Sequence, residues 1–489
     1  MRTVLILLDS LNRRNLKCYN PNARGITPNI DKLAKESIVF DNHFIGSAPC
    51  MPARRDLFTG RTQFLERNWG GIEPFDVTLP AELRKKKVFC HMTTDHTHYF
   101  EIGGENYPYL FNTWDYHRGQ ELDLWVSRIN HPPLQDRYGK QSTQYELNRT
   151  KFVTEADFPS PKTFRSACEW AEDNKGCDDF FLMVECFDPH EPFDCPEEYL
   201  KLYGDDYKGK EFNWTTYAPV TEPEDALKHL ENTYLATLTM TDKWLGVFID
   251  SLKANGLYED TMIILTTDHG HMLGEHGFTG KNFMHAYNEL AHIPLIVRLP
   301  NGEKGGTRSD ALTQNIDLMP TILKHHECPI PDRVLGMDLF DESLAPREQL
   351  IYGWFGRAVN VYDGKHTYFR APKDKDNQPL NLYCAMPTSI WHYLYFGEEH
   401  AETIEMGRYL PYTKYPVYRF PVTNPMGYGG RIEFVIESEL YDISTDYEQS
   451  KPIKDQKLEE EMCQKLIKAM EEAQTPKEQF ERLGLQIIA

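Results

Sequence analysis

The first two-thirds of the chain alternates short apolar runs with helical patterns, and this alternation constrains the fold more than any other feature. Helical spacing follows a capping residue and a proline at Thr27–Glu36, and an amphipathic pattern runs from Glu231 to about Ala254. Strands that alternate with helices form parallel sheets. We therefore expect an α/β fold with a large, mostly parallel sheet flanked by helices. The apolar runs predict its strands: Val4–Leu8, Val88–Thr93, Phe180–Glu185, Met262–Thr267 and Pro294–Arg298.

The pattern changes after about Ala345, where aromatic and proline residues become more frequent. An apolar run at Arg431–Ile436 predicts a strand, and a charged helix is expected near Lys457–Glu472. We therefore expect two domains, with residues 1–345 as the larger α/β domain and residues 346–489 as a smaller α+β domain.

Residues 103–161 lack clear periodicity and are rich in Tyr, Trp, His and Arg. One interpretation is an insertion that covers the mouth of an active site. The other is a well-packed surface excursion, and the sequence leaves both interpretations open.

The formal net charge of -21 excludes nucleic acid as an expected partner, because phosphate backbones require a basic surface. The same charge repels anionic esters, so any anion site needs a local basic pocket or a metal ion. The run Val4–Leu8 is too short for a signal peptide or a membrane span, and no later segment approaches spanning length. We expect a cytoplasmic protein with no membrane partner.

Four of the ten cysteines are evenly spaced, which raises the question of a metal site. Structural zinc sites require close pairs of cysteines, and this spacing does not provide them. We therefore expect reduced thiols without a structural role at Cys168, Cys177, Cys186 and Cys195.

Polar residues directly follow four of the expected strands. In open parallel sheets, ligands bind at the edge formed by the carboxyl ends of the strands. These residues are therefore expected to meet in one site: Asp9; Asp95, His96 and His98; Asp188 and His190; Asp268 and His269.

Cys50 opens a segment of the form Cys-x-Pro-x-Arg. Pro52 suits the first turn of a helix and Gly60 its end, so Cys50 is expected at or just before a helix N-terminus. The helix dipole is expected to lower the pKa of the thiol, and Arg54 to face the same way one turn later. The Cys50 nucleophile, the helix dipole and the Arg54 cation would then converge at a place where an oxyanion could bind. The alternative is a small buried apolar cysteine.

Asp268 and His269 offer an oxygen and an imidazole to a divalent cation. Lys281 follows and supplies a point charge suited to a sulfuryl or phosphoryl oxygen. An isolated Asp-His-Gly would be read as a polar turn at a strand end. Its combination with Asp9 and Cys50 favours a functional interpretation.

Taken together, the motifs resemble the sulfatase family of the alkaline phosphatase superfamily over most of the chain. Cys50–Arg54 is similar to the activation motif of that family, in which the cysteine is oxidised to formylglycine, and Thr59–Arg61 resembles the tail of the motif. The resemblance implies an alkaline-phosphatase-like fold, with residues 1–345 as the catalytic domain. Other segments follow the family pattern in order: Val4–Asp9, Thr27–Asp31, Asp268–Lys281, His292–Ile296, Asp317–Thr321 and Leu440–Glu448.

The resemblance also implies roles for individual residues. The family's Gly-Lys-x-His segment is absent, and Asp95–Tyr99 occupies its place, so those roles pass to the two histidines of this segment. The implied metal ligands are Asp9, Cys50, Asp268 and His269. The implied catalytic residues are Cys50, Arg54, His96, His98, His190 and Lys281.

Two departures from the family pattern concern the metal. Ser10 follows Asp9 where many sulfatases have a second aspartate, and His269 follows Asp268 where many have asparagine. This combination resembles the choline-sulfatase and phosphonate monoester hydrolase branch. The resemblance implies one divalent ion, calcium in typical sulfatases, and the softer ligand set leaves manganese open.

We therefore expect hydrolysis of a sulfate monoester by the hydrated formylglycine derived from Cys50. Arg54 and Lys281 would stabilise the developing charge, and His190, or one of His96 and His98, would protonate the leaving alcohol. The implied partners are a small-molecule or saccharide sulfate ester and a formylglycine-generating or anaerobic sulfatase-maturating enzyme. One alternative is a phosphonate monoester or phosphodiester hydrolase with the same site. The other is a non-catalytic binding protein, against which the intact residue set argues.

Overall fold

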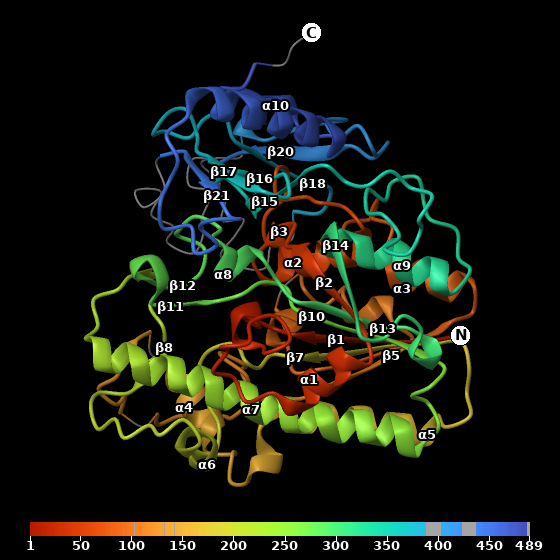
Figure 1. The fold of residues 1–489 in the computed structure, drawn as a ribbon, viewed down its shortest axis with the longest axis vertical. Helices are drawn as coiled ribbons and strands as arrows, with labels where there is room; N and C mark the ends of the chain where they lie inside the picture. The colour runs from red at the N-terminus through yellow and green to blue at the C-terminus, as the bar shows by residue number, and fades with distance from the viewer. Residues whose placement is uncertain (102, 132, 141, 388–401, 423–436, 487–489) are drawn as a thin grey trace.

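The main sheet has eight strands, and Figure 1 shows it in the computed structural model, which describes residues 1–486 except 102, 132, 141, 388–401 and 423–436. In order across the sheet the strands are β14 (Thr307–Gln314), β2 (Ile38–Phe44), β13 (Leu295–Arg298), β10 (Thr261–Thr266), β1 (Arg2–Leu8), β7 (Phe180–Cys186), β4 (Phe89–Thr94) and β5 (Thr113–Tyr116). β1 is parallel to β10 and β7, whereas β13 is antiparallel to β10 and β2. The expected mostly parallel sheet is confirmed, with β13 running against its neighbours.

Helices cover both faces of this sheet because the residues of its central strands are apolar on both sides. The helices are α1 (Pro28–Lys35), α2 (Cys50–Thr59), α3 (Leu79–Lys85), α5 (Pro159–Asp173), α7 (Glu224–Ala254) and α9 (Leu318–His325). In β1, Val4 and Ile6 pack in one core with α1, α5 and α7, while Leu5 and Leu7 pack in a second core with α2, α3 and α9. Figure 1 shows these two layers on opposite sides of the sheet.

A second sheet is built mainly from the last third of the chain. Its strands, in order, are β21 (Glu439–Asp442), β17 (His366–Arg370), β16 (Val359–Tyr362), β15 (Leu350–Trp354) and β3 (Ser47–Ala48). The predicted late helix is confirmed as α10 (Gln456–Glu472), which lies at the top of Figure 1. β3 pairs with β15 just before Cys50, so the C-terminal sheet supports the chain that leads into α2. The boundary at residue 345 stays a prediction, and Arg431–Ile436 lies outside the described residues.

The remaining elements form three small sheets and short helices. β11 (Met272–Leu273), β12 (Phe278–Gly280) and β9 (Ala218–Pro219) form one sheet, and β18 (Asn381–Cys384), β20 (Val417–Pro421) and β19 (Glu405–Gly407) another. β6 (Tyr138–Gly139) pairs with β8 (Phe212–Trp214). The short helices are α4 (Thr143–Arg149), α6 (Glu197–Lys201), α8 (Asn288–Ala291) and α11 (Lys477–Arg482).

Two features noted in the sequence can be compared with the structure, namely the cysteines and residues 103–161. All ten cysteines are free, the four evenly spaced ones included. Within residues 103–161, β5 forms an edge of the main sheet, so part of this region belongs to the core architecture. Among the described residues, no helix combines the length and the apolar character that a membrane span requires.

The strand register places the polar strand ends together. Leu8 pairs with Cys186, Leu7 with Thr266, and Thr94 with Glu185. The segments that follow β1, β4, β7 and β10 therefore leave the sheet at one edge, as the sequence predicts.

Candidate active site

Helix α2 presents Cys50 as its first residue. The helix ends at Gly60, whose φ of 62° lies in the left-handed region, so both predicted ends are confirmed. The loop before it is anchored at Ser47, whose N–H and hydroxyl donate to the Asp56 carboxylate at 2.6 and 2.8 Å. Burial raises the pKa of Asp56 to about 7. These bonds hold the start of α2 against its own second turn.

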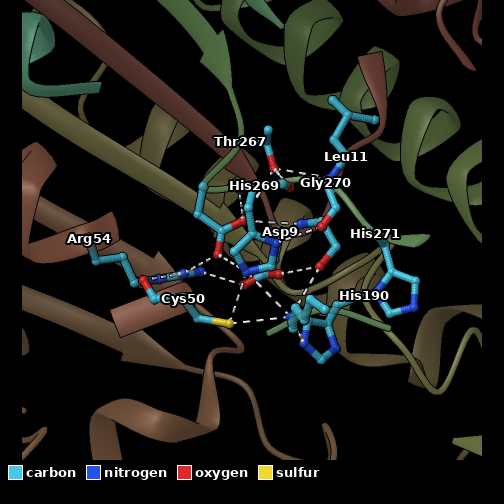
Figure 2. Close-up of polar contacts among 12 residues, drawn as sticks. Asp9, Leu11, Cys50, Arg54, His190, Thr267, His269, Gly270 and His271 are labelled. Carbon is cyan, nitrogen blue, oxygen red and sulfur yellow. Dashed lines mark hydrogen bonds and ion pairs between the residues drawn. The ribbon is translucent and has the colours of Figure 1, made fainter. Parts of the chain in front are cut away.

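Four predicted metal ligands converge at the sheet edge. The donor atoms of Asp9, Cys50, Asp268 and His269 all lie within 4.8 Å of one another, and all four residues are buried. Cys50 Sγ is 3.3 Å from Nε2 of His269, and Figure 2 shows the two side chains pointing toward each other beside Asp9. Residues that lie far apart in the sequence are thus brought into one cluster.

Arg54 fills the space on one side of this cluster. Its Nε donates to Glu185 Oε1 at 2.5 Å, Nη1 to Asp268 Oδ2 at 2.6 Å, and Nη2 to Asp9 Oδ2 at 2.8 Å. Nη1 also donates to the Cys50 carbonyl at 3.1 Å. The sequence predicted that Arg54 would face a bound oxyanion, whereas in the structure its guanidinium pairs with three carboxylates. It holds the carboxylates of Asp9 and Asp268 in position.

Lys281 lies on another side, just after β12. Its Nζ donates to Nε2 of His190 at 2.8 Å and lies 3.3 Å from Nε2 of His269 and 3.5 Å from Cys50 Sγ. Burial opposes the positive charge, but nearby acidic groups, Cys50 and Glu191 foremost, raise the pKa of Lys281. An ammonium group therefore lies beside the thiol of Cys50.

The electrostatics at Cys50 correct one expectation. Burial, and then the Asp9 carboxylate, raise the pKa of the thiol well above its usual value, although Lys281 acts in the opposite direction. The dipole of α2 was expected to lower it, but desolvation and neighbouring carboxylates outweigh a partial charge. Burial would also raise the pKa of Asp9, but Arg54 and Lys281 outweigh it and lower that pKa to about 2.

The two histidines after β4 have contrasting surroundings. His98 lies between two carboxylates, with Nδ1 2.9 Å from Glu101 and Nε2 3.1 Å from Glu121. Burial lowers the pKa of His98, but the two glutamates outweigh it and raise the pKa to about 10. Neither ring nitrogen of His96 has a hydrogen-bond partner among the described residues, and burial and Arg54 lower its pKa well below normal. In the described part of the chain, the Cys50 thiol contacts His269 and Lys281, and neither of these two rings hydrogen-bonds to it.

His190, unlike His96 and His98, hydrogen-bonds to Lys281 beside the Cys50 cluster. Its Nδ1 donates to the Glu191 carbonyl at 2.7 Å, which leaves Nε2 directed toward Lys281. Burial lowers the pKa of His190 well below its usual value. Figure 2 shows His190 and His271 side by side near the cluster.

Sequence reasoning missed three acidic residues of this site. Glu185 is a charged residue inside the apolar run of β7, and that oddity was an available signal. Glu191 accepts from Trp214 Nε1 at 3.1 Å, and its Oε2 is 3.3 Å from Nδ1 of His271. Glu121 lies in the aperiodic region with a φ of 43°, and nothing in its local sequence marked it. Sparse backbone conformations of this kind are concentrated at functional sites.

Comparisons with known proteins agree with this geometry. The Sulfatase family model matches residues 2–327. The uncharacterized sulfatase YidJ of Escherichia coli strain K12 is 27% identical, with 69% of this chain and 70% of YidJ covered.

Two solved structures share the fold. BT4656 in complex with its substrate D-glucosamine-2-N,6-O-disulfate aligns with a TM-score of 0.67 at 17% identity, covering 96% of this chain and 98% of that chain. The phosphonate monoester hydrolase of Agrobacterium radiobacter also aligns with a TM-score of 0.67 at 17% identity, covering 97% and 96%. The family match spans more than half of the chain and contains the whole cluster at the sheet edge. The chain therefore belongs to the sulfatase family of the alkaline phosphatase superfamily and is a sulfuric ester hydrolase.

Proposed function

We propose that this chain hydrolyses a sulfate monoester with a formylglycine derived from Cys50. The observation that carries the proposal is the convergence of Cys50 with two aspartates, an imidazole and the Lys281 ammonium in one buried cluster. Formylglycine at this position would supply a hydroxyl nucleophile where the thiol now lies. A maturating enzyme that oxidises Cys50 is therefore a required partner.

The cluster fits a divalent cation. Two carboxylates and one imidazole surround position 50, and this mixture of hard oxygen and nitrogen donors suits calcium or manganese. We assign Asp9, Asp268, His269 and the modified residue 50 as the ligands. Bound there, the ion would supply Lewis acidity at an ester oxygen.

The chain's own residues divide the remaining tasks. Arg54 orients the carboxylates of Asp9 and Asp268, so it is a positioning residue. Lys281 stabilises negative charge on the transferred sulfuryl group, because its ammonium lies 3.5 Å from Sγ of residue 50. We assign His190, whose Nε2 lies 2.8 Å from Lys281 Nζ, as the acid that protonates the leaving alcohol, because the negative charge of a bound ester would favour the protonated ring. We prefer His190 to His98, because both ring nitrogens of His98 are held by glutamates.

A phosphonate monoester or phosphodiester hydrolase is the second candidate, and the pair Asp268–His269 is the observation that favours it. The substrate of the sulfatase reaction is proposed as a small or saccharide sulfate ester. The cytoplasmic location stays a prediction.

The test is to produce the chain together with a formylglycine-generating enzyme and to analyse the Cys50 peptide by mass spectrometry. Turnover of 4-nitrophenyl sulfate is then compared with that of a 4-nitrophenyl phosphonate ester. Cys50→Ala should lower sulfate turnover by at least about a thousandfold. Cys463→Ala, on α10, is the matched control and should leave turnover unchanged. Faster turnover of the phosphonate would support the second candidate, and an unchanged Cys50→Ala rate would overturn both.

A further inference from the structure

Glu191 is a fully buried carboxylate that directly follows the proposed acid, His190. Its Oε1 accepts from Trp214 Nε1 at 3.1 Å and from the Tyr217 hydroxyl. Its Oε2 has no hydrogen-bond partner among the described residues. That oxygen lies 3.3 Å from Nδ1 of His190 and 3.3 Å from Nδ1 of His271, two rings that lie side by side in Figure 2. One oxygen of Glu191 therefore fixes the side chain, and the other lies between two imidazoles.

The surroundings of Glu191 keep it ionised and direct its charge to His190. Burial would raise the pKa of the carboxyl group, but His190, His271 and Lys281 outweigh burial and lower it. Burial lowers the pKa of His190, and Glu191 is the strongest of the groups that act in the opposite direction. The carboxylate therefore favours a positive charge on the ring that has to carry the proton.

Glu121 is the other carboxylate near the same ring nitrogen, but its charge is already compensated. Its Oε1 lies 3.6 Å from Nδ1 of His190, while its Oε2 lies 3.1 Å from Nε2 of His98. Burial opposes a charge on His98, but Glu101 and Glu121 raise its pKa to about 10, so that ring is protonated at neutral pH. In the described part of the chain, the ion-pair contacts of Glu191 are with His190 and His271.

The two oxygens of Glu191 nearest to His190 lie at Nδ1, on the side of the ring opposite the proposed acid proton. The main-chain carbonyl accepts from Nδ1 at 2.7 Å, and the carboxylate Oε2 lies 3.3 Å away. With Nδ1 held in this way, Nε2 is the nitrogen left to face Lys281, at 2.8 Å. A carboxylate behind a catalytic imidazole orients the ring and stabilises its protonated form.

We propose that Glu191 is a positioning residue for the acid step, because its Oε2 orients the ring of His190 and stabilises the protonated form that donates from Nε2. The inference rests on the proposed function, since His190 is the acid of that reaction. As the bond between sulfur and the leaving oxygen breaks, its electron pair stays on that oxygen, which takes the Nε2 proton. The ring is then neutral, with its remaining proton on Nδ1.

The test uses the leaving alcohol as the probe, because a poor leaving group depends on an acid and a good one does not. The full chain, produced with formylglycine at position 50, is assayed with 4-nitrophenyl sulfate and with 2-phenylethyl sulfate, an ester of an aliphatic alcohol. Glu191→Gln should lower kcat/KM about a hundredfold for 2-phenylethyl sulfate but less than about fivefold for 4-nitrophenyl sulfate. The glutamine keeps an acceptor for Trp214 and Tyr217. Glu198→Gln, at an exposed position on α6, is the matched control and should change neither rate.

Glu191→Asp provides a second reading, because it keeps the negative charge near His190. It should recover part of the loss for 2-phenylethyl sulfate. Binding of inorganic sulfate, measured by calorimetry, should be equal in the unsubstituted chain and in both variants, since the groups that hold the anion are unchanged. This result would separate an effect on the acid from a general disturbance of the site.

Equal losses for the two esters, equal losses in the Gln and Asp variants, or weaker sulfate binding by Glu191→Gln would each overturn the role of Glu191 and leave the proposed function intact. If the unsubstituted chain hydrolysed neither ester, the proposed function would fail, and this inference with it.

Discussion

Arg54 and Arg55 are neighbours on α2, and each is only 1% exposed, yet their surroundings are opposite. Arg54 faces the candidate active site and donates to three carboxylates at 2.5–2.8 Å. Arg55 lies about 100° further around the helix and donates to one backbone carbonyl. The two residues are chemically identical, so their roles are set by the segments that fold against each face of the helix.

The comparison has an energetic consequence. Removing one partner of a buried ion pair is costly because the other charges remain uncompensated, whereas replacing an unpaired buried charge by an apolar side chain is close to neutral. The four predictions below test this difference, beginning with the largest effect.

Arg54→Met should lower the free energy of unfolding by about 3–5 kcal/mol, because three buried carboxylates lose their common cation. Urea denaturation measures this loss, and metal analysis should show weaker retention of a divalent ion. Arg165→Met, at an exposed position on α5, is the control. If Arg54→Met were as stable as that control, the three carboxylates would not depend on Arg54.

Glu185→Gln keeps the shape of the side chain but removes one of the three charges around Arg54. We expect a loss of about 1–3 kcal/mol, smaller than for Arg54→Met, since Asp9 and Asp268 still hold the guanidinium. Denaturation of this variant and of Glu172→Gln, an exposed site on α5, gives the comparison. If Glu185→Gln lowered the free energy of unfolding as much as Arg54→Met does, the stabilising contribution of Arg54 would come from its pairing with Glu185 alone.

His98 and His96, two residues apart, show the same contrast between a buried side chain paired with carboxylates and one without a hydrogen-bond partner among the described residues. The pKa of His98 is raised to about 10, so its protonated form stabilises the fold fully below about pH 6.5, and this contribution disappears as the pH rises toward 10. Stability should therefore fall by about 1–2 kcal/mol between pH 7 and pH 10. Glu121→Gln should weaken that fall, and Glu169→Gln, which is exposed, should not. Identical pH profiles for the two variants would show that Glu121 does not hold the proton of His98.

Arg55→Met should change the free energy of unfolding least, by no more than about 1 kcal/mol. The reason is that the variant removes a charge that has no carboxylate hydrogen-bond partner in the described part of the chain. Urea denaturation beside Arg54→Met makes the comparison direct. A loss of about 3 kcal/mol or more would mean that Arg55 has an acidic partner in solution.

Much of this architecture could be predicted because it depends on local patterns. The five apolar runs form strands, α2 begins at Cys50 and ends at Gly60, and polar residues follow the strands at one edge. The antiparallel direction of β13 was not predictable, because its apolar run looks the same in either direction. Glu121 was also missed, since its place beside His98 depends on how an aperiodic segment folds back.

The sequence by itself determined which residues could serve the chemistry and, through the carboxyl ends of parallel strands, that they would meet. The tertiary structure alone decided what each of them touches. It directed Arg54 to carboxylates and Arg55 to a backbone carbonyl, and it raised the pKa of a thiol that the helix dipole was expected to lower. The physical reason is that charge pairing and desolvation depend on distances of a few ångströms between segments that are distant in the sequence.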